Sequence, residues 1–458
     1  MNNSFISRRE LLKYGLKAGA VASLSSSLLV TSCSKKGVGR KHPNVILISI
    51  DTLRADHLAC YGYKQPTSPS MDKLASGGLL FEDVSSPSPW TLPAHVSLLT
   101  GLYPNRHGVK THLTLMPMQL LVLAEVLKDH GFTTAAIVNS HYVSQRYGFE
   151  RGFNEFIYVP EQLSNPAPSQ VERKALKWLS TTHKQPFFLF LHYYDVHSDY
   201  CALPEYSEKF VRPYSGPVDG STAQLINFRE EKFTLSQRDV QHLTDLYDAS
   251  ILQMDDGIAR LLLFLEKKDL LDDTVIILTS DHGEEFLEHG GVLHGRTQYQ
   301  ELMHVPLIIR GPGLPAGRRI KQIASLADLM PTVLAMLHIS VPPGLDGIDL
   351  TPLWQGSGEL PLRFVFGEAD HNNVENDIKR AVRHPRYKLH YDRLTKKSQL
   401  YDLIEDPNEG NDVADIHPAM AGLLMQRLME FMSIERSGKR LPSLSPQEIE
   451  KLRSLGYL

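Results

Sequence analysis

The sequence has little of what several protein classes require. It contains three cysteines in 458 residues, too few for a disulfide-stabilised scaffold. Its 48 basic and 52 acidic side chains nearly balance, so the chain lacks the basic excess typical of nucleic-acid binders. It also lacks the series of long apolar runs that a polytopic membrane protein needs. With 42% hydrophobic residues, it is instead a globular protein, and any anionic ligand must be held by a local site.

The N-terminal segment has the pattern of an export signal. Arg8 and Arg9 precede a lysine and a weakly apolar, serine-rich stretch, which resembles a twin-arginine signal. The stretch ends at Cys33, in a context that resembles a lipoprotein cleavage site at which the cysteine is acylated. We expect residues 1–33 to be this signal, 34–42 a tether, and the mature protein to be lipid-anchored in the periplasm or at the cell surface. An N-terminal anchor helix with an incidental cysteine is the alternative.

Buried-strand and helical patterns alternate along the body of the chain. Continuous apolar runs, typical of strands buried on both faces, occur at 44–50, 133–138, 187–191, 274–279 and 305–309. Helical patterns lie between them, at 120–130 and 236–265. This alternation predicts an α/β fold with a large, mostly parallel sheet between helices.

The pattern changes after residue 355. Short strand patterns at 364–366, 387–391 and 399–401 precede a helical pattern at 420–432. We therefore expect a catalytic α/β domain at 43–355 and a small C-terminal α+β subdomain with a short antiparallel sheet at 356–458.

Metal-ligand side chains follow two of the predicted strands. Asp51 directly follows the first strand, and Asp281-His282 follow the strand at 274–279. In open parallel sheets ligands bind beyond the carboxyl ends of the strands. One such aspartate is usually a turn or helix cap, but two strand ends with an adjacent imidazole indicate a metal site.

A third candidate lies at the start of a predicted helix. Pro93 belongs in a first helical turn, so Thr91 falls at or near the N-cap of a helix that ends at Thr100. The hydroxyl either caps this helix or lies at its positive end, where free backbone N–H groups favour a phosphate or sulfate. Local spacing leaves both alternatives open.

Several motifs together resemble the sulfatase family of the alkaline phosphatase superfamily. They are Asp51, Thr91 to His95 with Thr100-Gly101, Asp281 to Glu284, Glu288 to Gly290, His294-Gly295, and residues 305–311 and 400–407. The resemblance spans roughly residues 43–410. It implies an α/β fold, a divalent metal at the strand ends, and hydrolysis or transfer of a sulfuryl or phosphoryl group.

The chain departs from a formylglycine sulfatase at the nucleophile. Sulfatases carry Cys or Ser in a C/S-x-P-x-R motif, whereas here Thr91 stands at the nucleophile position and His95 at that of the arginine. The pair Asp281-His282 replaces the usual Asp-Asn, and an imidazole ligand shifts the metal preference toward zinc or manganese. With Asp51, this set is similar to that of threonine-nucleophile phosphoryl transferases and diesterases. We expect one divalent ion, with zinc or manganese favoured over calcium or magnesium.

Histidines supply candidate proton donors. His192 and His197 bracket a segment that matches the family's His-x-x-Asp-Pro-His motif, with valine in place of proline, and His294 matches a substrate-contacting histidine. Imidazole is suited to general-acid catalysis near neutral pH. We predict that His197, His294 and His95 act in catalysis with Thr91.

Three functions fit this site. The first is a metal-dependent hydrolase or transferase of phosphate, phosphodiester or phosphonate esters. In it the Thr91 hydroxyl, acidified by the metal, attacks phosphorus and the resulting ester is discharged by water or an alcohol. The alternatives are a sulfatase that acts on extracellular sulfated glycans and a surface lipoprotein that binds its ligand without chemistry. The expected partners are a small anionic ester, glycan or lipid-headgroup substrate and, through Cys33, a membrane.

Overall fold

The computed structural model describes residues 42–161, 169–181, 185–231, 234–356, 358–370, 378–434 and 439–440, with two isolated positions at 447 and 450. The predicted signal peptide and almost all of the predicted tether lie outside these residues, so both remain predictions.

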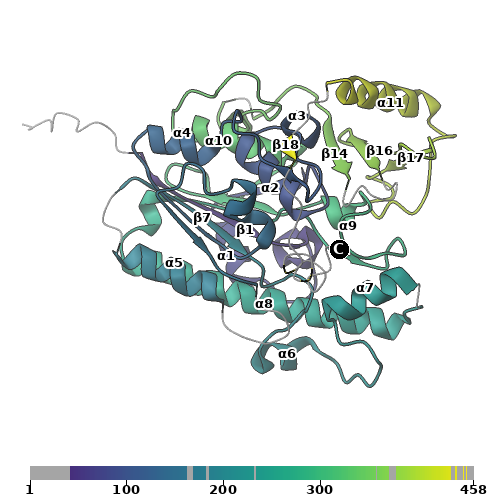
Figure 1. The fold of residues 1–458 in the computed structure, drawn as a ribbon, viewed down its shortest axis with the longest axis horizontal. Coiled ribbons are helices and arrows are strands. Elements are labelled where there is room, and N and C mark those ends of the chain that lie inside the picture. Colours follow the sequence, from purple (N-terminus) through teal and green to yellow (C-terminus); the bar gives the residue numbers. More distant parts are fainter. Residues whose placement is uncertain are drawn as a thin grey trace, which may run out of the picture. The chain divides into compact units, whose positions relative to one another are not determined.

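An eight-stranded sheet forms the centre of the fold (Figure 1). Its strands, in spatial order, are β12 (Arg318–Ile320), β2 (Leu79–Phe81), β11 (Leu307–Arg310), β8 (Thr274–Thr279), β1 (Asn44–Ile50), β7 (Phe187–Tyr193), β5 (Thr133–Val138) and β6 (Glu155–Tyr158). Only β11 runs antiparallel to its neighbours, β8 and β2, while the other adjacent pairs are parallel. The predicted mostly parallel sheet is therefore confirmed.

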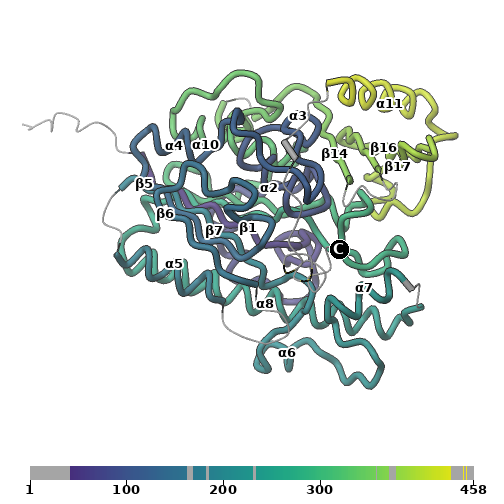
Figure 2. Tube along the Cα trace, viewed as in Figure 1, coloured from purple at the N-terminus to yellow at the C-terminus, as the bar shows by residue number. Residues whose placement is uncertain are grey.

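Helices cover both faces of this sheet because alternate residues of each strand point in opposite directions. On one face, Val45 and Leu47 of β1 share a core with three helices: α2 (Thr91–Thr100), α4 (Leu123–Asp129) and α10 (Leu329–Met336). On the other face, Ile46 and Ile48 share a core with α1 (Pro69–Ser76), α5 (Gln170–Thr181) and α8 (Gln237–Lys267). Figure 2 shows α5 and α8 running along that second face.

A smaller antiparallel sheet follows near the C-terminus, as predicted. It consists of β14 (Val365–Ala369), β15 (Lys379–Arg383), β16 (Tyr387–Asp392) and β17 (Ser398–Asp402), in that order. Helix α11 (Pro418–Met432) packs on it through Leu424 and Leu428, against Val382 and Leu389. The sequence patterns missed β15.

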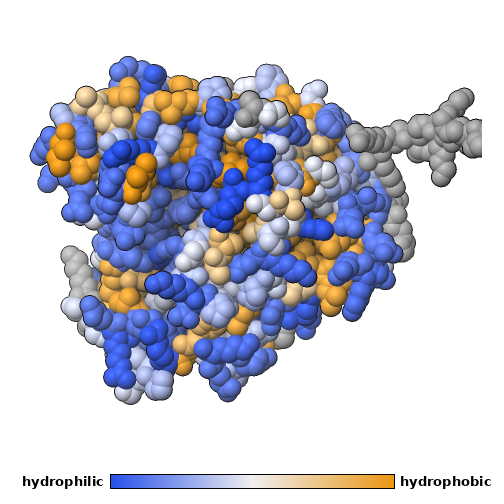
Figure 3. Space-filling model, turned by 180° about the vertical axis from the view of Figure 1, so that it is seen from behind, coloured by the Kyte–Doolittle hydropathy of each residue, from blue (hydrophilic) through white to orange (hydrophobic). Residues whose placement is uncertain are grey.

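Shorter elements connect these layers. They are α3 (Pro104–His107), α6 (Pro204–Phe210), α7 (Thr222–Glu231), α9 (Gln300–Met303), β3 (Val84–Ser85), β4 (Thr114–Leu115), β9 (Glu285–Phe286), β10 (Val292–Leu293), β13 (Ala324–Ser325) and β18 (Lys439–Arg440). Among the described residues, no helix combines the length and apolar character that crossing a membrane requires. The face seen in Figure 3 is mostly hydrophilic, with separate apolar patches. Cys60 and Cys201 are free thiols.

Candidate functional site

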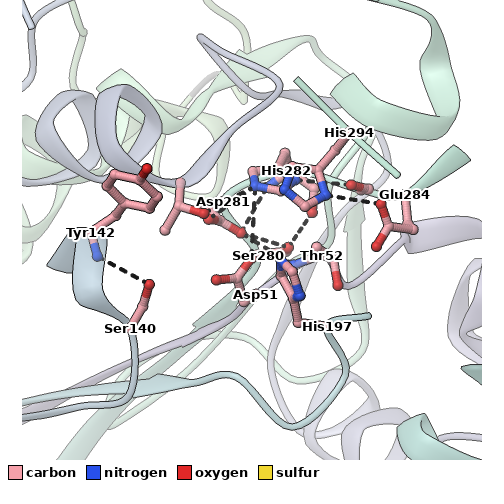
Figure 4. Close-up of polar contacts among 12 residues, drawn as sticks. Asp51, Thr52, Ser140, Tyr142, His197, Ser280, Asp281, His282, Glu284 and His294 are labelled. Atoms are coloured by element: carbon pink, nitrogen blue, oxygen red, sulfur yellow. Dashed lines mark hydrogen bonds and ion pairs between the residues drawn. The ribbon is translucent and has the colours of Figure 1, made fainter. Parts of the chain in front are cut away.

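The carboxyl ends of three adjacent strands meet at one edge of the sheet. Asp51 follows β1, and Asp281 and His282 follow β8 on one side of it. On the other side of β1, His192 lies near the end of β7. Figure 4 shows Asp51, Asp281 and His282 converging there. The strand-end rule therefore places the predicted metal ligands together.

The four predicted metal-site residues form one buried cluster. The His282 Nε2 lies 3.4 Å from the Thr91 hydroxyl oxygen, 3.4 Å from Asp281 Oδ2 and 3.7 Å from Asp51 Oδ1. All four side chains are fully buried. The structure thus brings together Asp51, Thr91, Asp281 and His282 from segments that lie far apart in the sequence.

Thr91 is the first residue of α2, and Trp90 occupies the N-cap position. The Thr91 side chain contacts His282 rather than capping the helix. The sequence left two alternatives for this hydroxyl: to cap the helix or to lie at its positive end. The geometry agrees with the second, because the hydroxyl faces the site. The α2 N-terminus also directs its positive dipole end toward the same cluster.

Hydrogen bonding fixes which atoms of the cluster face one another. The His282 Nδ1–H donates to the Gly283 carbonyl at 2.9 Å, so its Nε2 carries a lone pair. The backbone N–H groups of His282 and Thr52 donate to Asp281 Oδ1, which leaves Asp281 Oδ2 facing the centre. An imidazole lone pair therefore faces carboxylate oxygens, an arrangement that repels unless a cation lies between them.

Unsatisfied carboxylate oxygens indicate the same cation. Within the described residues, both oxygens of Asp51 and Oδ2 of Asp281 are buried without a hydrogen-bond partner. Burial raises the pKa of Asp51 from 3.8 to about 7. Buried carboxylates are costly unless they are paired or coordinate a metal. Two carboxylates, one imidazole and one hydroxyl fit a divalent ion, so Asp51, Asp281, His282 and Thr91 are the residues that would hold it.

His192 extends this cluster. Its Nε2 lies 3.4 Å from Asp51 Oδ2, and neither of its ring nitrogens has a hydrogen-bond partner in the described part of the chain. Burial lowers its pKa to about 4, so the ring is neutral. The sequence analysis placed His192 among the proton donors after the strand. The rule used for Asp51 would have identified it as a metal-site residue, because β7 extends to Tyr193 and pairs with β1.

His95 supports Thr91 rather than offering a free ring nitrogen. Its Nδ1–H donates to the Thr91 carbonyl at 2.8 Å, and its Nε2 accepts from the Ser49 hydroxyl at 2.9 Å. Burial lowers the pKa of His95 to about 3, which keeps the ring neutral. These contacts link the first turn of α2 to β1. The His95 Nδ1 also lies 3.5 Å from Asp281 Oδ2, and the catalytic role of His95 stays a prediction.

The predicted proton donors His197 and His294 lie together beside the cluster. Their ring centres are 4.9 Å apart, and the His294 ring is 4.5 Å from that of His282. The His294 Nδ1 donates to Glu284 at 2.9 Å, and the Tyr200 hydroxyl donates to the other Glu284 oxygen at 3.0 Å. Burial lowers the pKa of both histidines well below the ordinary value. A carboxylate that orients His294 is a contact that sequence spacing did not predict.

Family models match most of the chain. Residues 43–339 match the sulfatase model, and residues 288–434 match the model of the N-sulphoglucosamine sulphohydrolase C-terminal region. The chain belongs to the sulfatase family. Two groups of its described side chains could hold a metal ion: Asp51, Asp281 and His282, and His95, His192 and Asp281.

Curated relatives cover nearly the whole protein. An N-acetylglucosamine-6-O-sulfatase of Bacteroides thetaiotaomicron is 24% identical, over 93% of this chain and 91% of its own length. Human arylsulfatase A is 27% identical, over 83% of this chain and 80% of its own. A multifunctional alkaline phosphatase superfamily protein of Trinickia caryophylli is 26% identical, over 85% and 94%.

Solved structures share the fold. A protein in complex with its substrate, D-glucosamine-2-N,6-O-disulfate, superposes with a TM-score of 0.75 at 21% identity, covering 86% of this chain and 98% of its own. The phosphonate monoester hydrolase of Agrobacterium radiobacter superposes with a TM-score of 0.71 at 22% identity, covering 86% and 96%. The family model and these relatives make this protein a sulfatase-like ester hydrolase, against the non-catalytic alternative.

Proposed function

We propose that this protein hydrolyses the sulfate ester of a small sugar or glycan, with Thr91 as the nucleophile. The observation that carries the proposal is the buried Thr91 hydroxyl, 3.4 Å from His282 Nε2 in a cluster of metal-ligand side chains. The sulfatase relatives, one of them an N-acetylglucosamine-6-O-sulfatase, support the sulfuryl group and the sugar.

Charge balance favours a substrate with a single negative charge. Asp51 and Asp281 together offset a divalent ion, and burial lowers the pKa of His197 and His294, which keeps both rings neutral. Arg54 is engaged by Asp56 at 2.8 Å and by Glu288 at 2.5 Å. A sulfate ester carries one negative charge, whereas a phosphomonoester at neutral pH carries nearly two. The site therefore fits a sulfate ester better than a phosphomonoester.

The residues divide the chemistry among them. A divalent ion held by Asp51, Asp281 and His282 would supply Lewis acidity, acidifying a bound hydroxyl and neutralising an ester oxygen. Thr91 Oγ1 then forms a bond to sulfur as the bond from sulfur to the leaving oxygen breaks. The proton that Thr91 loses would reach the leaving oxygen through His294, whose neutral ring is oriented by Glu284 and lies beside His197. Water attacks the sulfo-threonine in a second step, which releases sulfate and restores Thr91.

A second candidate is hydrolysis of a phosphonate monoester or phosphodiester, which also carries a single charge. Threonine in place of the formylglycine precursor and His282 at the metal site favour it, since a threonine ester of phosphorus is discharged by water in the same two steps. The same imidazole favours zinc or manganese over calcium.

One panel of substrates tests both candidates. Aryl sulfate, phosphonate monoester, phosphodiester and phosphomonoester are assayed with zinc, manganese and calcium. We expect turnover of the singly charged esters to exceed that of the phosphomonoester, and the sulfate-to-phosphorus ratio to choose between the candidates. Thr91→Ala should reduce kcat by about 10³-fold or more while bound metal, measured by mass spectrometry, is retained. Full activity of this variant would exclude Thr91 as the nucleophile.

The proposed location is a lipid-anchored protein exported by the twin-arginine route. Arg8, Arg9 and Cys33 support it through the signal pattern alone. Replacing both arginines with lysine should block export, and Cys33→Ala should release the protein from the membrane fraction. An exported Lys-Lys variant would contradict the route.

A further inference from the structure

The turn that follows β1 contains a strained residue. Thr52 has a φ of 59°, which lies in the left-handed region. A β-branched side chain rarely adopts this conformation, because the atoms on its Cβ crowd the backbone. A strained residue persists only where its surroundings hold it, and such residues cluster at functional sites. Thr52 directly follows Asp51, so the strain lies beside a proposed metal ligand.

The backbone of this turn determines where Asp51 points. Both carboxylate oxygens of Asp51 lack a hydrogen-bond partner among the described residues, so no such bond orients the side chain. On the N-terminal side, the Asp51 N–H donates to the Tyr193 carbonyl at 2.9 Å, which continues the pairing of β1 with β7. On the C-terminal side lies Thr52, whose N–H donates to Asp281 Oδ1 at 3.4 Å (Figure 4). The conformation of Thr52 therefore affects both carboxylates of the proposed metal site.

Tyr247 of α8 holds this turn through its hydroxyl group. The hydroxyl donates to the Thr52 carbonyl at 2.7 Å and accepts from the Arg54 N–H at 2.9 Å. The Thr52 hydroxyl adds a further hydrogen bond, to the Val196 carbonyl at 3.3 Å. Thr52 and Tyr247 are both fully buried, so water does not compete for these bonds.

The ring of Tyr247 is itself fixed by packing. It lies edge-on to the rings of His57 and Tyr200, with centres 5.0 Å and 5.7 Å away, and its centre is 5.1 Å from that of Phe286. A buried ring packed against three others keeps one position in a densely packed core. The Tyr247 hydroxyl is therefore a fixed anchor for the turn.

We propose that Tyr247 is a positioning residue for the metal site, which holds Thr52 in its left-handed conformation and thereby directs Asp51 toward the ion. This inference rests on the proposed metal site and not on which ester is cleaved. Groups that orient metal ligands without binding the ion themselves typically raise metal affinity by about 10- to 100-fold. The hydroxyl of Tyr247 has this place in the structure, one residue away from Asp51.

Metal binding in the absence of substrate tests the proposal. Tyr247→Phe keeps the packed ring and removes the hydroxyl, so zinc and manganese affinity, measured by competition with a chelating dye, should fall by about tenfold. The matched control is Tyr206→Phe. Tyr206 is a buried tyrosine whose hydroxyl donates to Asp256 of the same helix, α8, at 2.8 Å, and its loss should leave metal affinity unchanged.

A second pair of variants tests the strain itself. Thr52→Gly and Thr52→Val both remove the hydrogen bond to Val196, but glycine adopts a φ near 59° freely, whereas valine does not. We therefore expect Thr52→Val to bind metal about tenfold more weakly than Thr52→Gly. In the Thr52→Gly background, Tyr247→Phe should reduce metal affinity less than it does in the wild type, because the hydroxyl acts through the conformation of residue 52.

Every outcome of these measurements decides the proposal. It would be overturned by wild-type metal affinity in Tyr247→Phe, by equal losses in Tyr247→Phe and Tyr206→Phe, or by an undiminished effect of Tyr247→Phe in the Thr52→Gly background. Equal affinities of Thr52→Gly and Thr52→Val would also overturn it, and this comparison applies even if Tyr247→Phe does not fold. A wild-type protein that binds neither ion would do the same. If no ester is hydrolysed but Tyr247→Phe alone weakens metal binding, the proposed function fails and the positioning role stands.

Discussion

Glu284 orients His294 through a 2.9 Å hydrogen bond to Nδ1, while the Tyr200 hydroxyl holds the opposite carboxylate oxygen at 3.0 Å. All three side chains are buried, so this carboxylate has no contact with bulk water to weaken its effect. Such a pair fixes the orientation of the imidazole and stabilises its protonated form.

Glu284→Gln should therefore lower kcat more than it changes KM. The glutamine keeps the shape and one acceptor oxygen but removes the negative charge that stabilises a protonated His294. We expect a loss in kcat of about 10- to 100-fold and a shift of the acidic limb of the pH–kcat profile to lower pH. Tyr200→Phe should give a smaller loss in the same direction. An unchanged pH profile would show that Glu284 is only structural.

His192 should contribute to metal affinity. Its Nε2 is 3.4 Å from Asp51 Oδ2, and both of its ring nitrogens lack hydrogen-bond partners among the described residues. His192→Asn should weaken zinc or manganese binding by about 10- to 100-fold, as other changes beside metal ligands do. Competition with a chelating dye measures this affinity. His107→Asn is the control, because His107 is equally buried but is hydrogen-bonded to Ser97 within the core. Equal losses of metal affinity in the two variants would refute a role of His192 in metal binding.

Removal of the metal should make stability depend on pH through Asp51. Burial raises its pKa from 3.8 to about 7, so between those values the folded metal-free protein keeps a proton that the unfolded chain has released. Stability of the metal-free protein should then fall as pH rises from about 4 to about 7, by on the order of a few kcal/mol. Urea unfolding of chelator-treated protein at pH 5 and pH 8 measures the difference.

Asp51→Asn supplies the comparison for that experiment, because the amide does not titrate. Its metal-free stability should change less between the two pH values, and added metal should stabilise the wild type at pH 8 far more than the variant. A wild type and a variant with the same pH dependence would show that Asp51 does not titrate in this window.

We expect Glu409 to stabilise the folded protein strongly, because it joins the smaller sheet to α9. It is buried, lies 3.1 Å from Lys388 Nζ and 2.8 Å from His390 Nε2, and accepts from the backbone N–H of Gln300 at 2.6 Å. Burial alone would raise its pKa, but Lys388 and His390 lower it to about 2.

Glu409→Gln removes the charge and leaves Lys388 buried without its counter-ion. We expect a loss of about 3–5 kcal/mol in the free energy of unfolding, measured by urea denaturation. The control Glu405→Gln changes an exposed side chain 3.9 Å from Arg386 and should cost less than about 1 kcal/mol. Equal losses in the two variants would contradict the role of Glu409.

Sequence patterns located the buried centre of the sheet well. The predicted strands at 44–50, 133–138 and 274–279 coincide with β1, β5 and β8, because strands covered on both faces need continuous apolar runs. The three-residue strands β2 and β12 were missed, since so short a segment has no readable period. The antiparallel direction of β11 was also not predicted, because strand direction depends on long-range pairing.

The site was predictable where a strand end or a family motif marked it. Asp51, Asp281 and His282 follow from the strand ends, and Thr91 follows from the family motif, although its role remains a prediction. The contacts of His95 with Ser49, and of Glu284 with Tyr200, were not predictable from local sequence. They join residues from different segments, and only the folded sheet brings these segments together.

The side chains of the proposed metal site come from segments far apart along the chain, with Asp51 after β1 and Asp281 and His282 after β8. A ribosome-bound chain that stops before β8 contains Asp51 but lacks both Asp281 and His282. We therefore expect the chain to bind its metal ion only after β8 has been synthesised, and a polypeptide truncated before β8 to retain neither zinc nor manganese.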